Sequence, residues 1–447
     1  MAGGYQYETA PHSRQVDSLS PATSFLAHVI FTFFILYYII SMSPFVDLST
    51  SDSVDPAMEK SNFLNQITFV LLTSLIWIYK SIVRTRVAAA DIIAIISVIT
   101  IWFAVSSLGS DEPIQSLKHL ALASLTCMNA AVILLLPDTE RQFARMLLAC
   151  CFVALLLSYF GVAFLPHLAI HQESEIREPM NAGLWRGHFP HKNAASANMV
   201  IVLFVCLYAY ELGKRWSSVA IGSLAMVFLL FSGGKAAMAA LPGILFLAFV
   251  FERVSVLRPI IVVAGIIVCN VVTIGSSTSG EFRQAVGALG IDPTFTNRID
   301  IWRIGVDAFL SRPFLGHGFE GFWQNKLIVF KAGTEEDWAY AAFNGHNAYL
   351  DTALTTGIPG LTLTFLWLIV LPLFDFRRAQ ESSNSTAQLR LFTRIWMYGI
   401  FVGCVESIFY SSGNFLWIAT VMSVCGIHYR TKTSLFQRLQ GHRIPIG

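Results

Sequence analysis

The residues best suited to chemistry stand where a polar stretch meets an apolar run. His346 and Asn347 directly precede the apolar segment Tyr349–Phe374. An imidazole can accept a proton near neutral pH, so His346 is a candidate general base, although a single loop histidine is more often an ordinary surface residue. Gly357 and Pro359 are expected to kink the apolar segment and to leave space beside it.

A second candidate lies in the polar stretch itself. Residues 296–313 have the periodicity of an amphipathic helix. At 100° per residue, Arg298 lies on the apolar face, whereas Asp300 and Arg303 lie on the solvated face, where they can pair. Arg298 is therefore either a long side chain that anchors the helix at the membrane interface or a planar guanidinium directed at an anionic group.

Basic residues also gather before the apolar run that begins at Ala194. Arg186, Lys192 and Asn193 belong to this group, and Asn193 is the predicted N-cap of the helix. Positive charge at a helix N-terminus opposes the helix dipole unless an anion is bound there. The group therefore predicts a site for an anionic ligand, with contacts to lipid phosphates as the alternative.

Two further charges lie near the ends of apolar runs. Lys235 begins one of these runs, and Glu406 lies within the segment Leu391–Tyr410. A carboxylate in an apolar segment is costly unless it is paired, so we expect Glu406 to face the interior of a helix bundle. Its expected partner is Lys235 or an arginine of the polar stretch.

The sequence predicts neither a metal site nor a disulfide. His167, His171, His188 and His191 lie near several glutamates, but their spacing does not match the His-Glu-x-x-His signature. The seven cysteines all lie within apolar runs and are expected to pack as small core residues. No cofactor is predicted.

The composition places these residues in a membrane protein. The 447-residue chain is 55% hydrophobic and 13% charged, with a mean hydropathy of +0.60. This is too apolar for a soluble globular protein, and apolar runs of roughly 20 residues can span a bilayer as helices. We predict an all-α integral membrane protein with about twelve transmembrane helices. The predicted spans are 25–42, 63–83, 87–108, 117–136, 146–165, 194–212, 217–231, 236–251, 259–274, 349–374, 391–410 and 415–429.

Charge predicts the orientation of the chain in the membrane. Lysine and arginine are concentrated on the cytoplasmic side of membrane proteins, and here alternate connections are basic, which places both termini inside. The candidate residues then lie on the outer face. The net charge of +2 does not indicate a nucleic-acid partner. The resulting organisation is a disordered cytoplasmic tail (1–24), spans one to nine (25–275), a large and partly helical periplasmic loop (276–345), spans ten to twelve (346–429) and a basic cytoplasmic tail (430–447).

Four blocks of the sequence resemble the O-antigen ligase and polymerase superfamily of bacterial membrane glycosyltransferases. Two positions depart from the family pattern, because Lys235 stands where arginine is usual and Thr355 stands where an acidic residue is frequent. The blocks are Arg186–Met199 (RGHFPHKNAASANM), Ser232–Gly243 (SGGKAAMAALPG), Asn297–Phe322 (NRIDIWRIGVDAFLSRPFLGHGFEGF) and Gly345–Leu361 (GHNAYLDTALTTGIPGL).

The resemblance implies an enzyme of the bacterial inner membrane with its active site in the periplasm. Such an enzyme takes a glycan from undecaprenyl diphosphate and needs no metal. His346 would be the catalytic base, and Arg298 and Arg186 would hold the diphosphate, with Arg298 as a catalytic group. The other predicted substrate-binding residues are Lys192, Asn193, Lys235, Arg303, Asn347 and Glu406.

The acceptor of the glycan is left open by the sequence. A polymerase would transfer the glycan to another lipid-linked repeat unit, and a ligase would transfer it to lipid A-core. The pattern HKNAASANM favours an exopolysaccharide polymerase. Expected partners are these lipid-linked glycans, membrane lipid, and chain-length regulator or export proteins. A secondary transporter is the alternative of another class, but it predicts midplane charges and paired broken helices, which the sequence does not show.

Overall fold

The protein is helical throughout the part of the chain that the structure describes. This computed structural model describes residues 21–41, 43–49, 63–83, 89–175, 178–290, 292–295, 298–323, 339, 342–381 and 386–432. An isolated antiparallel bridge between Ile170 and Trp185 is the only β-type pairing within these ranges. The all-α prediction is confirmed for them. The predicted N-terminal tail up to residue 20 and the C-terminal tail beyond residue 432 lie outside the described residues.

Every predicted apolar segment forms a helix. Ten helical segments in the described ranges are long and apolar enough to cross a membrane, and the other two predicted spans fold as α17 and α18. The count of twelve spans stays a prediction. The long helices are α1 (Pro21–Ile40), α2 (Phe63–Val83), α3 (Ala89–Leu108), α4 (Pro113–Ile133), α5 (Glu140–Phe164), α7 (Lys192–Glu211), α8 (Arg215–Ser232), α9 (Lys235–Arg253), α10 (Gly265–Thr278), α15 (Ala348–Phe365), α16 (Leu371–Glu381), α17 (Thr386–Val402) and α18 (Phe415–Lys432).

Shorter elements connect the long helices. Two π-helical turns continue α10 and α15, so that 255–278 and 348–381 each form one long helical segment. The described residues of the predicted loop 276–345 include the helices α11 and α12, which agrees with its predicted partly helical character. The side of the membrane on which the loop lies stays a prediction. The short elements are α6 (Pro166–Ala169), η2 (Pro179–Asn181), η3 (Ser255–Leu257), η4 (Ile260–Ala264), α11 (Gly280–Ala288), α12 (Arg298–Ser311) and η5 (Leu366–Val370).

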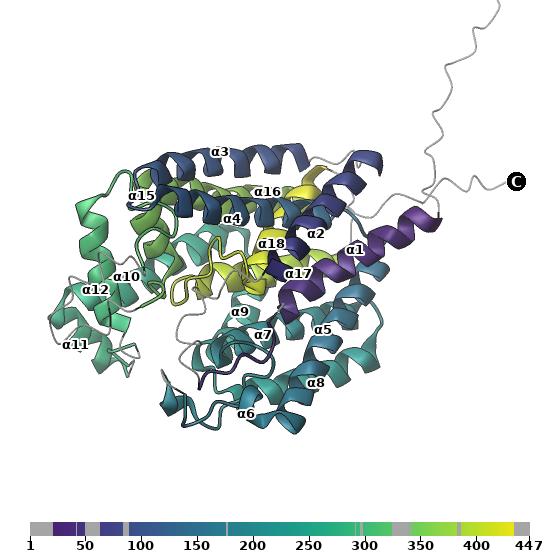
Figure 1. Cartoon of the computed structure of the whole chain (residues 1–447), viewed down its shortest axis with the longest axis horizontal. Helices are drawn as coiled ribbons and strands as arrows, with labels where there is room; N and C mark the ends of the chain where they lie inside the picture. Colours follow the sequence, from purple (N-terminus) through teal and green to yellow (C-terminus); the bar gives the residue numbers. More distant parts are fainter. Residues whose placement is uncertain are drawn as a thin grey trace, which may run out of the picture.

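The core of the bundle is built around α18. Residues 415–430 of this helix are all buried, and α18 packs against α17, α16 and α4 (Figure 1). A helix that is buried on every side needs apolar residues all round rather than one apolar stripe. Trp396 of α17 and Trp417 of α18 are fully buried. At the left of Figure 1, α10, α11 and α12 gather at one end of the bundle.

The kink predicted in the tenth span is present in α15. Gly357 has φ 69° and ψ −177°, a conformation almost confined to glycine, and it interrupts the helix two residues before Pro359. An added Cβ at Gly357 would overlap with the backbone carbonyl of Phe314. The kink therefore needs glycine at this position.

A chain segment from the loop satisfies the backbone groups that the kink leaves open. The N–H groups of His317 and Gly318 donate to the carbonyls of Leu354 (3.0 Å) and Thr355 (2.8 Å). The indole of Trp102, on α3, donates to the carbonyl of Thr356 (2.9 Å). Unpaired carbonyls are costly inside a bilayer, so this arrangement explains how the helix tolerates the interruption. It also fastens segment 313–318 between α3 and α15.

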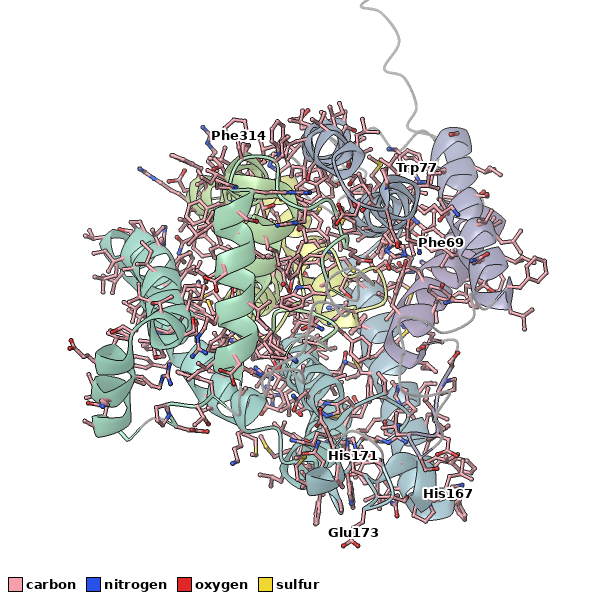
Figure 2. All side chains as sticks on the ribbon, turned by 60° about the vertical axis from the view of Figure 1, so that its left-hand side comes forward. Phe69, Trp77, His167, His171, Glu173 and Phe314 are labelled. Carbon is pink, nitrogen blue, oxygen red and sulfur yellow. The ribbon has the colours of Figure 1, made fainter. Side chains whose placement is uncertain are left out.

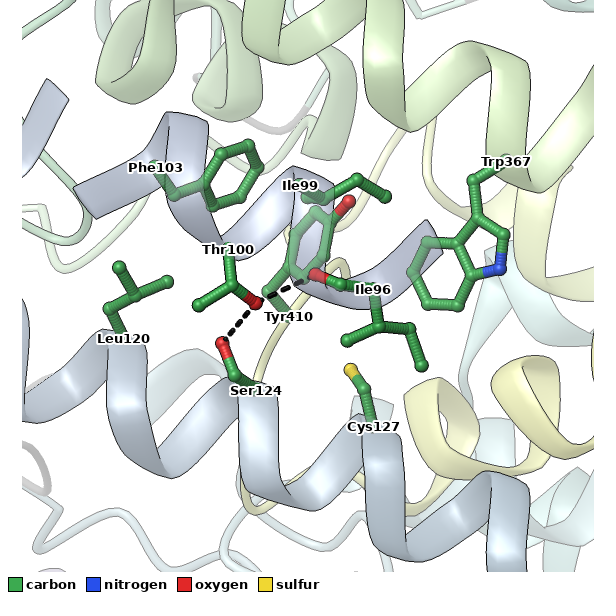
Figure 3. A pocket seen from close by; sticks show the side chains of 9 residues that line it. All are labelled: Ile96, Ile99, Thr100, Phe103, Leu120, Ser124, Cys127, Trp367 and Tyr410. Atoms are coloured by element: carbon green, nitrogen blue, oxygen red, sulfur yellow. Dashed lines mark hydrogen bonds between the residues drawn. The ribbon is translucent and has the colours of Figure 1, made fainter. Parts of the chain in front are cut away.

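The interior near this junction is tightly packed. A cavity of about 10 Å³ lies between α3 and α4, where the Thr100 hydroxyl donates to Ser124 (2.9 Å), and Trp367 and Tyr410 close one side (Figure 3). A space of this size holds at most about one water molecule, so it belongs to the core and not to a ligand site.

Candidate functional site

Three of the predicted residues meet at one end of the bundle. Arg298 donates from Nη2 to Oε1 of Glu406 (2.8 Å) and from Nη1 to the carbonyl of Val405. His346 places Nδ1 3.4 Å from Oε2 of the same Glu406. The side chains are 18%, 25% and 33% exposed for Arg298, Glu406 and His346, so the cluster is half-buried but open to a ligand. The predicted pairing of Glu406 with an arginine of the polar stretch is confirmed.

The position of Glu406 differs from the prediction. The eleventh helix ends at Val402 rather than at Tyr410, and Glu406 lies in the irregular connection between α17 and α18. The chain leaves the helix because the carbonyl of Gly403 accepts the N–H of Ala348 (2.7 Å), at the start of α15. This contact brings the connection beside His346. The prediction that Glu406 lies within a helical span was wrong, because an apolar run can continue through a segment that is not helical.

The surroundings of Glu406 keep its carboxylate charged. Burial alone would raise the pKa of Glu406, but the Arg298 guanidinium and the hydrogen bond and charge of His346 lower this pKa to about 2. An opposite charge within a few ångströms commonly has an effect of this size. Glu406 is therefore an anion at any ordinary pH, and its two oxygens can accept hydrogen bonds from the nitrogens of both neighbours.

The backbone around His346 is held from both sides. His346 has φ +46°, a left-handed conformation that is uncommon for residues other than glycine. Before it, the indole of Trp302 on α12 donates to the carbonyl of Gly345 (2.8 Å). After it, Asn347 caps α15 by accepting the N–H groups of Tyr349 (3.1 Å) and Leu350 (2.9 Å). The conformation of His346 is thus imposed by its neighbours, as is typical of functional positions.

Asn347 has a structural position in this geometry. It is fully buried, and its Nδ2 donates to Asn270 (2.9 Å) and to the carbonyl of Cys404 (2.9 Å). All the polar atoms of its side chain are thereby engaged with the protein. Its predicted contact with substrate stays a prediction, and its observed role is to join α15 to α10 and to the connection that carries Glu406.

Asp351 is a half-buried carboxylate that the sequence interpretation did not single out. It accepts the N–H of Gly345 (3.0 Å), the indole N–H of Trp323 (2.8 Å) and the hydroxyl of Ser407. A Cβ at Gly345 would overlap with this carboxylate. Asp351 therefore ties the residue before His346 to the residue after Glu406. A carboxylate in the first turn of a predicted apolar span was the signal that could have revealed it.

The start of α7 contributes a second set of side chains. The N-cap is His191, not the predicted Asn193: Nδ1 of His191 accepts the N–H of Asn193 (3.1 Å). The prediction failed because a neutral imidazole can fill the acceptor role usually played by asparagine. Asn193 instead directs its amide to Oε1 of Glu406 (3.5 Å), which places it at the cluster.

Lys192 connects this helix start to the other charges. Its N–H donates to Nε2 of His171 (3.2 Å), whose pKa is lowered by burial, so that the ring is neutral and can accept. The half-buried Lys192 ammonium interacts electrostatically with Lys235, Glu406 and Arg298. Lys235 is exposed and begins α9. The two lysines thus supply positive charge beside the His346 cluster.

Arg303 and Arg186 are placed differently. Arg303 pairs with Asp300 (3.5 Å) on the solvated face of α12, as the helical spacing predicted. Arg186 is fully buried, and its guanidinium donates to the carbonyls of Val46 (2.6 Å) and Phe189 (3.4 Å). In this conformation Arg186 supports the loop before α7. Its predicted contact with a diphosphate stays a prediction.

The histidines of the loop between α5 and α7 lie in different environments. Figure 2 shows His167 and Glu173 at the surface, whereas His171 is buried against Glu175 (2.6 Å). His188 lies between Ser158 and the carbonyl of Ile39, and burial lowers its pKa to about 4. No group of three metal-binding side chains occurs among the residues that the structure describes.

Comparison with known proteins shows which proteins the chain is similar to. Residues 217–365 match the family model described as O-Antigen ligase. The exopolysaccharide production protein ExoQ of Rhizobium meliloti (strain 1021) is 24% identical over 217 residues, which are 46% of this chain and 50% of that protein. Both matches support the resemblance to the O-antigen ligase and polymerase superfamily. The chain matches only about half the length of this curated relative.

The region that matches the family model contains most of the site. Lys235, Arg298 and His346 lie inside residues 217–365, together with three of the four blocks that carry the resemblance. The block Arg186–Met199 and Glu406 lie outside it. The predicted resemblance to the superfamily is confirmed, and the roles of individual residues stay predictions.

Proposed function

We propose that the protein is a membrane glycosyltransferase of polysaccharide biosynthesis. It transfers a glycan from undecaprenyl diphosphate to a sugar hydroxyl on the outer face of the bacterial inner membrane. The cluster of His346, Glu406 and Arg298 carries this proposal, because it joins a proton acceptor, a fixed anion and a fixed cation at one open site.

His346 acts as the general base of the transfer. Nδ1 faces the Glu406 carboxylate, so a proton on Nδ1 is held there and the other ring nitrogen, Nε2, is the acceptor. The acceptor hydroxyl gives its proton to Nε2 while its oxygen forms a bond to the anomeric carbon. The positive charge that develops on the imidazole is stabilised by Glu406, as a carboxylate orients and stabilises histidine in hydrolytic triads.

The diphosphate leaves as the bond from the anomeric carbon to its oxygen breaks. The leaving group carries the electron pair of that bond and gains negative charge, which fixed cations stabilise. Lys192 and Lys235 provide charge beside the cluster and are placed for this role. Arg298 holds Glu406 with part of its guanidinium, and a planar guanidinium has further N–H groups for a diphosphate oxygen.

We propose polymer growth as the specific reaction. The relative that covers part of the chain is named as an exopolysaccharide production protein, which favours a repeat-unit polymerase over an O-antigen ligase. The test is reconstitution with an undecaprenyl-diphosphate oligosaccharide, with and without lipid A-core. Products longer than the donor glycan without the core would support polymerisation, and product only with the core would establish a ligase instead.

The base assignment is tested in the same assay by His346→Ala. We expect product formation to fall by at least about 10²-fold, the usual contribution of a general base, because no other group takes the hydroxyl proton. His167→Ala is the matched control, since His167 is an exposed histidine of the outer loop (Figure 2). Both variants should be recovered from the membrane in wild-type amount. Undiminished product with His346→Ala would rule out the proposed base.

A further inference from the structure

A second open site lies on the side of the bundle, between α1 and α5. A groove of about 640 Å³ runs between residues 28–36 of α1 and residues 142–149 of α5. Both helices run in the same direction here, because Phe31 packs on Phe143 and the Cys150 thiol reaches the carbonyl of Thr32. The groove is far from His346. Helix α5 begins at the polar end of the groove, and the chain then crosses the bundle to the start of α7, which lies at the His346 cluster.

The groove has one polar end and is apolar along the rest of its length, as an amphiphilic ligand is. His28, Gln142 and Arg145 line one end, and Phe33, Leu36 and Ala149 line the rest. The eight helical steps from residue 28 to residue 36 give a length of about 12 Å. This is close to one leaflet of the hydrocarbon core, which is about 15 Å, half of the usual thickness. The small side chain of Ala149 leaves the apolar part open.

The charges at the polar end favour an anion. Arg145 is exposed, and its Nε donates to the carbonyl of Arg141 (3.2 Å), which holds the side chain at the groove. Nearby acids are already engaged: Asp138 binds His28 (3.3 Å) and Ser24. Glu140 lies about 160° around α5 from Gln142 and accepts from Tyr208 (3.3 Å), which faces the bundle interior.

We propose that this groove binds one anionic phospholipid, with an acyl chain along the apolar floor and the phosphate on Arg145. Arg145 lies about 8 Å from the start of α5, a depth from which a long side chain reaches the headgroup level. The site is independent of the glycosyl transfer.

Native mass spectrometry of the full chain in detergent tests the site. Dioleoyl-phosphatidylglycerol is titrated in parallel with dioleoyl-phosphatidylcholine, which shares its acyl chains but has no net charge. We expect the first bound phosphatidylglycerol to bind more tightly. In Arg145→Gln its affinity should fall about fivefold, which is about 1 kcal/mol at 298 K and the attraction of one basic residue to an anionic lipid. Ala149→Phe should weaken binding of both lipids, because it fills the acyl groove.

Two controls separate this site from general lipid binding. Arg141→Gln removes an exposed cation about 100° away from Gln142 on the same helix. Ile267→Phe enlarges an exposed apolar residue on α10. Neither should change the binding of phosphatidylglycerol. Equal affinities for the two lipids, or unchanged binding in both Arg145→Gln and Ala149→Phe, would show that the groove holds no specific lipid. All variants are first checked for a wild-type unfolding temperature.

Discussion

At the scale of single residues, Glu406 is the point where the charges of the site meet. It binds Arg298 through one oxygen and faces His346 with the other. Because the pKa of Glu406 is lowered to about 2 from its ordinary value of 4.5, its charge stabilises the fold above pH about 4.5. That contribution is lost only as the pH falls through about 2. Loss of activity in mild acid must therefore come from another group.

Glu406→Gln tests whether the charge of Glu406 supports His346 during the reaction. We expect kcat/KM to fall by about 10²-fold, because the imidazolium loses its anion. Asp300→Asn, which removes a carboxylate from the solvated face of α12, should leave kcat/KM unchanged. A wild-type kcat/KM in Glu406→Gln would contradict a role for the Glu406 carboxylate in the reaction.

The pairing of charged side chains in apolar segments was the most predictable feature of the site. Glu406 was expected to need a cation because it is a carboxylate in an apolar run, and Arg298 is that cation. The same argument applies to Asp351, which was missed. The N-cap His191 and the burial of Arg186 were not predictable, because both depend on how the loop before α7 folds back on residues 39–47 and 171–178. Local patterns carry no information on such contacts.

At the scale of elements, the kinked helix α15 positions the site. Its first turn carries Asp351 and the cap Asn347, and its middle is interrupted at Gly357. The interruption lets segment 313–318, which follows α12, lie against the helix. The element that carries Arg298 is thereby fixed to the element that follows His346.

Gly357→Ala should destabilise the protein. The backbone conformation alone costs alanine about 1–3 kcal/mol, and the overlap of its Cβ with the Phe314 carbonyl adds to this. We expect a lower unfolding temperature in detergent and a lower activity of the remaining folded protein. Gly243→Ala is the control, because Gly243 lies inside α9 with open space around its Cα. A wild-type unfolding temperature for Gly357→Ala would show that the kink is not required.

Helix positions were predictable from hydropathy, and helix ends were not. The apolar runs located all the long helices because a span must bury its backbone polar groups within itself. The end of α17 was misplaced because residues 403–410 are apolar enough to continue a span while their backbone turns to meet Ala348. A contact between segments far apart in the sequence decided this boundary.

At the scale of the whole molecule, opposite ends of the bundle carry different charges and contacts. The end away from His346 holds basic residues paired with acids at helix ends, such as Arg390 and Arg394 with Glu211 (2.6 and 3.7 Å). These residues lie at helix ends that the charge rule predicts to face the cytoplasm. The His346 cluster and α12 lie at the other end.

The orientation is tested by labelling single introduced cysteines in intact cells. Ser311, at the end of α12, and Ser217, in the first turn of α8, are both exposed. A membrane-impermeant maleimide should label Ser311→Cys in intact cells and Ser217→Cys only after permeabilisation. The seven native cysteines lie within apolar runs, and the unmodified chain gives the background. The reverse pattern would place the site in the cytoplasm.

The contacts that hold segment 313–318 between α3 and α15 limit the order in which the protein can fold during its synthesis. Ser106, on α3, donates to the carbonyls of Leu315 (2.6 Å) and Thr355 (2.8 Å), which leave the ribosome 209 and 249 residues later. A segment can reach its final packing during synthesis only after the residues that it contacts have also been made. Arg298 and His346 can therefore reach their final positions only after α15 and the Glu406 connection have been inserted. A chain that ends before its last quarter lacks both His346 and Glu406, and so it cannot form the cluster.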